Sequence, residues 1–145
     1  MKVSFLPAVG VLSLAPAILT LVGGCASTPP QTEPTTFRQV LPLLETNCVH
    51  CHGEQRLPSM PALTDTRALA ALIGPARIIV PGEPERSRFF QVVTFADNQA
   101  GAMPPTGHAI SKREVKTLRA WIQAGAPLPA ENIALTPRGT AIRSL

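Results

Sequence analysis

Residues 48–52 read Cys-Val-His-Cys-His, a C-x-x-C-H pattern from which the rest of the chain can be interpreted. Two cysteines three residues apart can add their thiols across the two vinyl groups of one haem, and the histidine that follows at once can ligate the iron from the same side. We therefore predict Cys48 and Cys51 as the covalent attachment residues and His52 as an axial ligand of the iron. The predicted cofactor is one covalently bound haem c.

Two other interpretations of the cysteine pair stay open on the sequence alone. A thioredoxin-like redox pair would need a strand, a helix and a strand around it, whereas a helical pattern precedes Cys48 and a proline-rich loop follows His52. A structural zinc site would use both cysteines and two histidines, but the spacing to His108 fits no common zinc finger. A zinc module would be colourless, which separates it from a haem protein.

The sequence around the motif resembles the class I c-type cytochromes, and more closely the small cytochrome c domains of planctomycete-type secreted proteins. The resemblance runs over residues 37–129 and includes C-x-x-C-H, M-P-P at 103–105 and W-I-Q-A-G-A-P at 121–127. It implies an all-α fold, a single cytochrome c domain of three to five short helices around one covalently bound haem. In such domains the first and last helices cross, which would bring Trp121 near Phe37.

The second axial ligand must come from the opposite face of the haem. Met103 is the candidate, because it lies far enough after His52 for the chain to wrap the haem edge and because two prolines stiffen its loop. The resemblance points to the same methionine, and a thioether ligand raises the reduction potential of the iron. Met60, His108 and an open sixth position are the alternatives.

The resemblance also implies that the carbonyl group of Pro61 accepts a hydrogen bond from His52. Such a bond fixes the orientation of the imidazole ring and raises the basicity of the ligand. A plain turn is the alternative at this proline, since the chain contains 16 prolines. The haem propionates could pair with an arginine, and Arg67, Arg77 and Arg88 are the candidates.

Helix signals precede the motif and recur near the end of the domain. Thr36 and Gln39 match a capping box, and apolar residues recur at helical spacing over 37–48, where Pro42 predicts a kink or a later start. A second capping box at Ser111-Lys112-Arg113-Glu114 predicts a last helix that stops after Ala124. We expect two shorter helices between them, over residues 66–73, capped by Asp65, and over residues 84–93.

The amino-terminal segment is predicted to be a targeting signal. Residues 1–24 carry one positive charge and a mostly apolar stretch broken by two prolines, which favours a lipoprotein signal peptide over a membrane-spanning helix. Leu21-Val22-Gly23-Gly24-Cys25 resembles a bacterial lipobox, in which the cysteine is lipidated and becomes the first mature residue. By the same resemblance Ala26 favours the outer membrane. We expect a lipid-anchored protein on the periplasmic side, with a proline-rich tether over 25–36.

Length and composition exclude several classes of protein. The chain has 145 residues, of which 45% are hydrophobic and 15% are charged, and this composition suits one small domain. We predict that this domain covers residues 37–129 and that an irregular tail follows over 130–145. The high proline content argues against long helices and central strands. The formal charge of +4 is scattered along the chain, so no nucleic-acid partner is expected.

The predicted ligands indicate electron transfer and not catalysis. An iron held by His52 and Met103 has no position free for a substrate, and the chain shows no nucleophile with an adjacent base, no useful carboxylate pair and no phosphate loop. The expected partners are donor and acceptor proteins, and no small-molecule substrate is expected. The alternative is a haem-based sensor or a peroxidase-like enzyme, whose sixth position would be open or labile.

Overall fold

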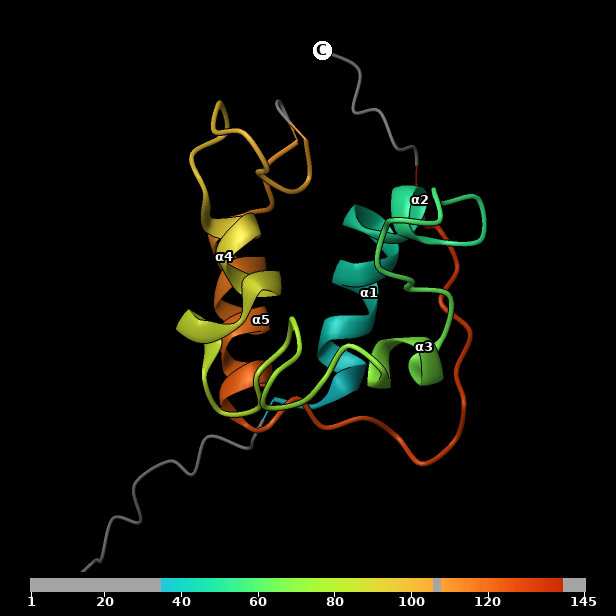
Figure 1. Cartoon of the computed structure of the whole chain (residues 1–145). Coiled ribbons are helices and arrows are strands. Elements are labelled where there is room, and N and C mark those ends of the chain that lie inside the picture. Colours follow the sequence, from blue (N-terminus) through green and yellow to red (C-terminus); the bar gives the residue numbers. More distant parts are fainter. Residues whose placement is uncertain (1–34, 106–107, 140–145) are drawn as a thin grey trace, which may run out of the picture. The chain divides into compact units, whose positions relative to one another are not determined.

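The computed structural model describes residues 35–105 and 108–139, which contain five α-helices and one 3-10 helix. In chain order these are α1 (Phe37–Asn47), α2 (Val49–His52), α3 (Thr66–Ala70), η1 (Pro84–Arg86), α4 (Arg88–Thr94) and α5 (Lys112–Gln123) (Figure 1). The described residues form isolated bridges but no strand. The prediction of an all-α fold with short helices is confirmed.

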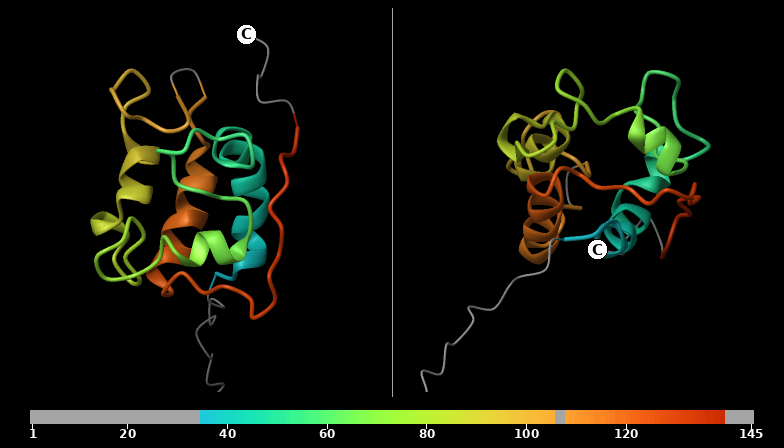
Figure 2. Two further views of the ribbon diagram at one scale, coloured as in Figure 1. Left: turned by 45° about the vertical axis from the view of Figure 1, so that its right-hand side comes forward. Right: turned by 90° about the horizontal axis from the view of Figure 1, so that it is seen from below.

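The first and last helices contact each other and supply the centre of the core (Figure 2). Trp121 of α5 is fully buried, and its indole Nε1–H donates a hydrogen bond to the Pro127 carbonyl at 2.9 Å. Trp121 and Phe37 belong to one buried cluster. The other buried residues that α1 and α5 contribute to it are Val40, Leu43, Leu44, Leu118 and Ile122. The predicted helix pair therefore forms the core.

Both predicted capping boxes are present at the helix starts. The Thr36 N–H donates to Gln39 Oε1 at 2.8 Å, and α1 begins at Phe37 and runs through Pro42, so it has no later start. At α5 the Ser111 N–H donates to Glu114 Oε2 at 2.8 Å, and the Ser111 hydroxyl accepts from the Glu114 N–H at 3.2 Å. These local bonds satisfy N–H groups that the first helical turn leaves without a partner.

The predicted helix over 66–73 is shorter in the structure. Asp65 caps it as expected, because its carboxylate accepts a hydrogen bond from the Ala68 N–H at 2.7 Å. That bond is the main reason why the pKa of Asp65 lies below its ordinary value. The helix ends at Ala70. The Ala71 N–H still bonds four residues back, to the Arg67 carbonyl, but the amides of Leu72 and Ile73 bond only three residues back, in tighter turns.

The predicted helix over 84–93 is divided into η1 and α4 at Ser87. Ser87 is fully buried, and its hydroxyl donates to the Glu83 carbonyl at 2.9 Å and accepts from the Val80 N–H at 2.8 Å. A serine side chain that bonds nearby backbone groups competes with the helical hydrogen bonds. This competition explains the extended backbone at Ser87, which begins a new helix.

The described part of the predicted tail, residues 130–139, contains no helix but packs against the rest of the domain. The Thr66 N–H donates to the Ile133 carbonyl at 2.9 Å, and the Leu135 N–H donates to the Thr64 carbonyl at 2.9 Å. Leu135 is buried in the core cluster. The segment runs past α3 and along α1 toward α2 (Figures 1 and 2). The packed structure therefore continues beyond Pro129.

The predicted signal peptide and Cys25 lie outside the described residues, as does the tether up to residue 34. Within the described ranges no helix has both the length and the apolar character needed to cross a membrane.

Candidate haem site

The two cysteines of the motif lie on one helical turn where α1 meets α2. The Cys51 and His52 amides both bond to the Cys48 carbonyl, at 3.2 and 3.0 Å. Residues three apart in a helix lie on the same face, which suits two thiols that must reach one macrocycle. Both cysteines are free, with Cys48 partly buried and Cys51 exposed. The donor set therefore fits covalent attachment of haem.

A carboxylate from the last helix lies beside this turn. Glu114 Oε1 accepts a hydrogen bond from Asn47 Nδ2 at 2.9 Å, while its Oε2 caps the start of α5. Burial raises the pKa of the Cys48 thiol to about 12, and the charges of Glu114 and Cys51 add to this rise. In the chain without haem the Cys48 thiol therefore stays protonated at neutral pH.

His52 is oriented by the backbone of the following loop. Its Nδ1 lies 3.0 Å from the Pro61 carbonyl oxygen, and the His52 carbonyl accepts from the Leu63 N–H at 2.8 Å. Because a carbonyl only accepts, Nδ1 carries the proton in this bond, and Nε2 is the ring nitrogen left to face a metal. The contact that the resemblance implied at Pro61 is thus present in the structure.

Met103 lies in the loop that follows α4. Its N–H donates to the Val92 carbonyl at 2.8 Å, which ties the loop to α4, and its side chain is 36% exposed. Among the described residues only Leu57 and Met103 are large hydrophobic side chains exposed to this extent. The loop and α2 lie at the same end of the α1 and α5 pair (Figure 1). Met103 is thus accessible to a ligand at the end of the fold that carries the motif.

The alternative sixth ligands are Met60 and His108. Met60 precedes Pro61, the residue bonded to His52, so it belongs to the His52 side of the site. His108 is partly exposed, and its N–H donates to the Pro105 carbonyl at 3.2 Å.

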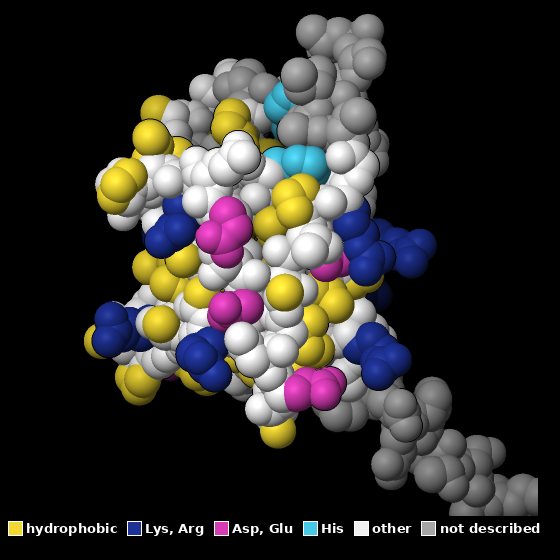
Figure 3. All heavy atoms as spheres, turned by 90° about the vertical axis from the view of Figure 1, so that its right-hand side faces the viewer, with side chains coloured by type: hydrophobic (Ala, Val, Ile, Leu, Met, Phe, Trp, Pro, Cys, Tyr) yellow, Lys and Arg dark blue, Asp and Glu magenta, His cyan; other side chains and the backbone are white. Residues whose placement is uncertain are grey.

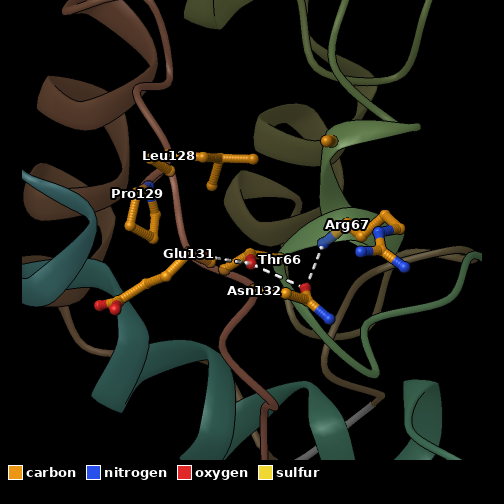
Figure 4. Close-up of a pocket in the computed structure, with 8 residues that line it drawn as sticks. Thr66, Arg67, Leu128, Pro129, Glu131 and Asn132 are labelled. Carbon is orange, nitrogen blue, oxygen red and sulfur yellow. Dashed lines mark hydrogen bonds between the residues drawn. The ribbon is translucent and has the colours of Figure 1, made fainter.

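The candidate arginines have different environments. The Arg88 guanidinium lies over the Phe95 ring, 5.1 Å from the ring centroid. Arg67 lines a cavity of about 250 Å³ between α3 and the segment that follows α5 (Figure 4). In this cavity Asn132 Oδ1 accepts hydrogen bonds from Thr66 Oγ1 and the Arg67 N–H, both at 3.1 Å. None of the predicted haem ligands lines the cavity, so it is separate from them.

The structure offers no support for the other interpretations of the motif. No strand flanks Cys48 or Cys51 in the part of the chain that is described, as a thioredoxin-like pair would require. Over the same ranges no group of three or more His, Cys, Asp or Glu side chains is arranged to hold a metal ion.

A protein-family model described as cytochrome c oxidase, cbb3-type, subunit III matches residues 36–122, which is more than half of the chain. The chain belongs to this family of class I c-type cytochromes. No curated protein and no solved structure gives a significant match. Because the chain belongs to this family, it carries covalently bound haem c. The C-x-x-C-H motif at 48–52 fits the attachment of this haem. It is a haem-binding electron carrier.

The sequence alone did not predict two long-range contacts made by residues near the motif. Asn47 bonds to Glu114 across 67 positions of the chain, and Glu45 bonds to Thr136 across 91. Neither residue belongs to a cap, a repeat or a metal-binding pattern. Their roles depend on contacts between distant segments, which no local signal in one sequence reports.

Proposed function

We propose that the cytochrome transfers single electrons through a haem iron ligated by His52 and Met103. The observation that carries this proposal is the 3.0 Å contact between His52 Nδ1 and the Pro61 carbonyl, because it orients the ring and leaves Nε2 for the iron. Cys48 and Cys51 hold the haem covalently, and Met103 supplies a thioether. The bound haem iron accepts and releases one electron.

The protein's own contribution is to hold both ligands in place. His52 is tied to the loop at Pro61, and the backbone of Met103 is tied to α4 at Val92. Ligands held by backbone hydrogen bonds move little when the charge of the iron changes, which keeps the reorganisation on electron transfer small. If His52 and Met103 both ligate the haem iron, no position on the iron would remain for a substrate.

The reaction of the reduced protein with carbon monoxide tests this function. We expect the visible spectrum to stay unchanged when carbon monoxide is added without denaturant, because both axial positions are occupied. Formation of a carbon monoxide adduct under these conditions would contradict the proposed ligand pair. It would favour the sensor or peroxidase-like alternative, whose sixth position is open or labile.

The partners of the cytochrome are redox proteins. On the face shown in Figure 3, basic, acidic and apolar side chains are interspersed, and no patch of one charge sign covers it. Such a face gives little electrostatic steering, so we propose that partners which dock on it do so through small, transient contacts.

We further propose that the cytochrome is lipid-anchored at Cys25, on the periplasmic side of a bacterial membrane, with the outer membrane favoured. The lipobox-like sequence at 21–25 supports the anchor, and the proline-rich tether over 25–36 would let the domain reach partners near the membrane surface. The family supports a location outside the cytoplasm, where c-type cytochrome domains are typically found.

Cys25→Ser is expected to release the cytochrome from the membrane fraction, because serine provides no thiol for lipidation. The measurement is the distribution of haem-stained protein between soluble and membrane fractions after washing with high salt. Ser27→Ala in the tether is the matched control and should remain in the membrane fraction. Retention of the Cys25→Ser protein after the wash would rule out anchoring at Cys25.

A further inference from the structure

The segment that follows the family match returns to the haem-attachment motif. We call residues 132–138 the C-terminal strap, which lies beyond the matched range of 36–122. The strap pairs with the chain around residues 64–66 and then reaches the end of α1 and the start of α2. Its last contacts are made with Glu45 and His50, the second of which lies inside the motif.

Glu45 is a buried acid that the strap supplies with partners. The Glu45 side chain is only 3% exposed. Its Oε1 accepts hydrogen bonds from the Thr136 N–H at 3.2 Å and from the Thr136 hydroxyl at 3.3 Å. Its Oε2 lies 2.5 Å from Arg138 Nε. The Arg138 N–H also donates to the Glu45 carbonyl at 3.0 Å. A buried carboxylate is costly unless it is paired and hydrogen-bonded. The position of Glu45 in the core therefore depends on the strap, and the strap is fixed at α1.

His50 links the strap to the haem-binding helix. Its Nε2 lies 3.1 Å from the Arg138 carbonyl oxygen, and Nε2 is the donor because a carbonyl only accepts. The helix α2 has four residues, too few to be stable without contacts to the rest of the protein. Its two histidine rings are each bonded to a backbone carbonyl of another segment, His52 to Pro61 and His50 to Arg138. These two bonds hold opposite sides of one short helix.

We propose that the C-terminal strap positions α2, and that His50 and Glu45 are positioning residues for His52. The inference rests on the proposed function, in which His52 is the proximal ligand. Glu45 holds the strap, the Arg138 carbonyl holds His50, and His50 holds the helix that carries His52. Loosening the strap lets α2 fluctuate, so the bond from His52 to Pro61 opens more often.

Hydrogen exchange in the reduced, full-length haem protein tests the proposal by NMR. In His50→Ala we expect the Nδ1–H of His52 and the N–H of Gly53 to exchange about tenfold faster, as for the loss of one hydrogen bond. His50→Gln should restore slow exchange, because its amide can donate to the same carbonyl. Arg86→Ala is the control, since it removes an exposed ion pair with Glu83 away from the strap.

A second variant keeps the test informative if His50→Ala fails to mature. The Arg138 side chain is 60% exposed, so Arg138→Ala leaves the motif and the apolar core intact while it removes the ionic partner of Glu45. Faster exchange at His52 in this variant supports the proposal. If only the strap amides of Thr136 and Arg138 exchange faster, or if no amide does, the strap does not position His52 and the proposal is wrong. Failure of the proposed function shows separately, as carbon monoxide binding by the wild type.

Discussion

Met103→Ala is expected to lower the reduction potential by on the order of 0.2 V, a fraction of the roughly 0.8 V range that axial ligands span in haem proteins. The physical reason is that a thioether ligand stabilises the reduced iron, and its loss leaves a weaker ligand or an open position. The weak ferric charge-transfer band of the thioether should disappear. A potentiometric titration followed by visible spectroscopy measures both effects.

Met60→Ala is the matched control for this prediction. Met60 also precedes a proline, but it lies on the His52 side of the site and should leave the potential and the band unchanged. A spectrum and potential that survive in Met103→Ala would show that Met103 is not the ligand. Loss of the band in Met60→Ala instead would assign the ligand to Met60.

Trp121→Ala is expected to lower the free energy of unfolding by about 3–5 kcal/mol, the usual cost of truncating a buried aromatic residue. Trp121 is fully buried between the first and last helices, and the substitution also leaves the Pro127 carbonyl without its indole donor. The loss is a large part of the roughly 5–15 kcal/mol that stabilises a small domain. Urea denaturation followed by circular dichroism measures it.

Leu57→Ala provides the control for the core prediction. The Leu57 side chain is 61% exposed, so its truncation should change the free energy of unfolding by no more than about 0.5 kcal/mol. Equal effects of the two substitutions would contradict the assignment of Trp121 to the centre of the core.

Local signals predicted much of this fold correctly. The capping boxes at Thr36 and Ser111 indicated where α1 and α5 begin, because a cap is formed by residues three positions apart in the sequence. The motif at 48–52 likewise contains three functional residues in five positions. Pro42 predicted a kink or a later start, but α1 begins at Phe37 and contains this proline. Because proline has no N–H, the Arg38 carbonyl, four residues earlier, loses its helical hydrogen bond. Arg38 is exposed, so water can reach this carbonyl.

The remaining features depend on contacts that the local sequence does not encode. The break at Ser87 arises from a hydroxyl that bonds to Val80 and Glu83 within a folded loop. The packing of residues 130–139 arises from bonds to Thr64, Thr66 and Glu45, far earlier in the chain. The segment has no helical period because its partners are loop and helix groups of other segments. Periodicity alone therefore could not distinguish this packed segment from an unstructured tail.

The most direct test of the account is acidic-acetone extraction of the purified protein after expression with a haem-attachment system. The account predicts that the red colour stays with the polypeptide, because Cys48 and Cys51 hold the haem through covalent bonds. A Cys48→Ser, Cys51→Ser double variant should lose its haem to the solvent. A colourless wild-type protein, or one whose haem is fully extracted, would contradict the assignment of the motif.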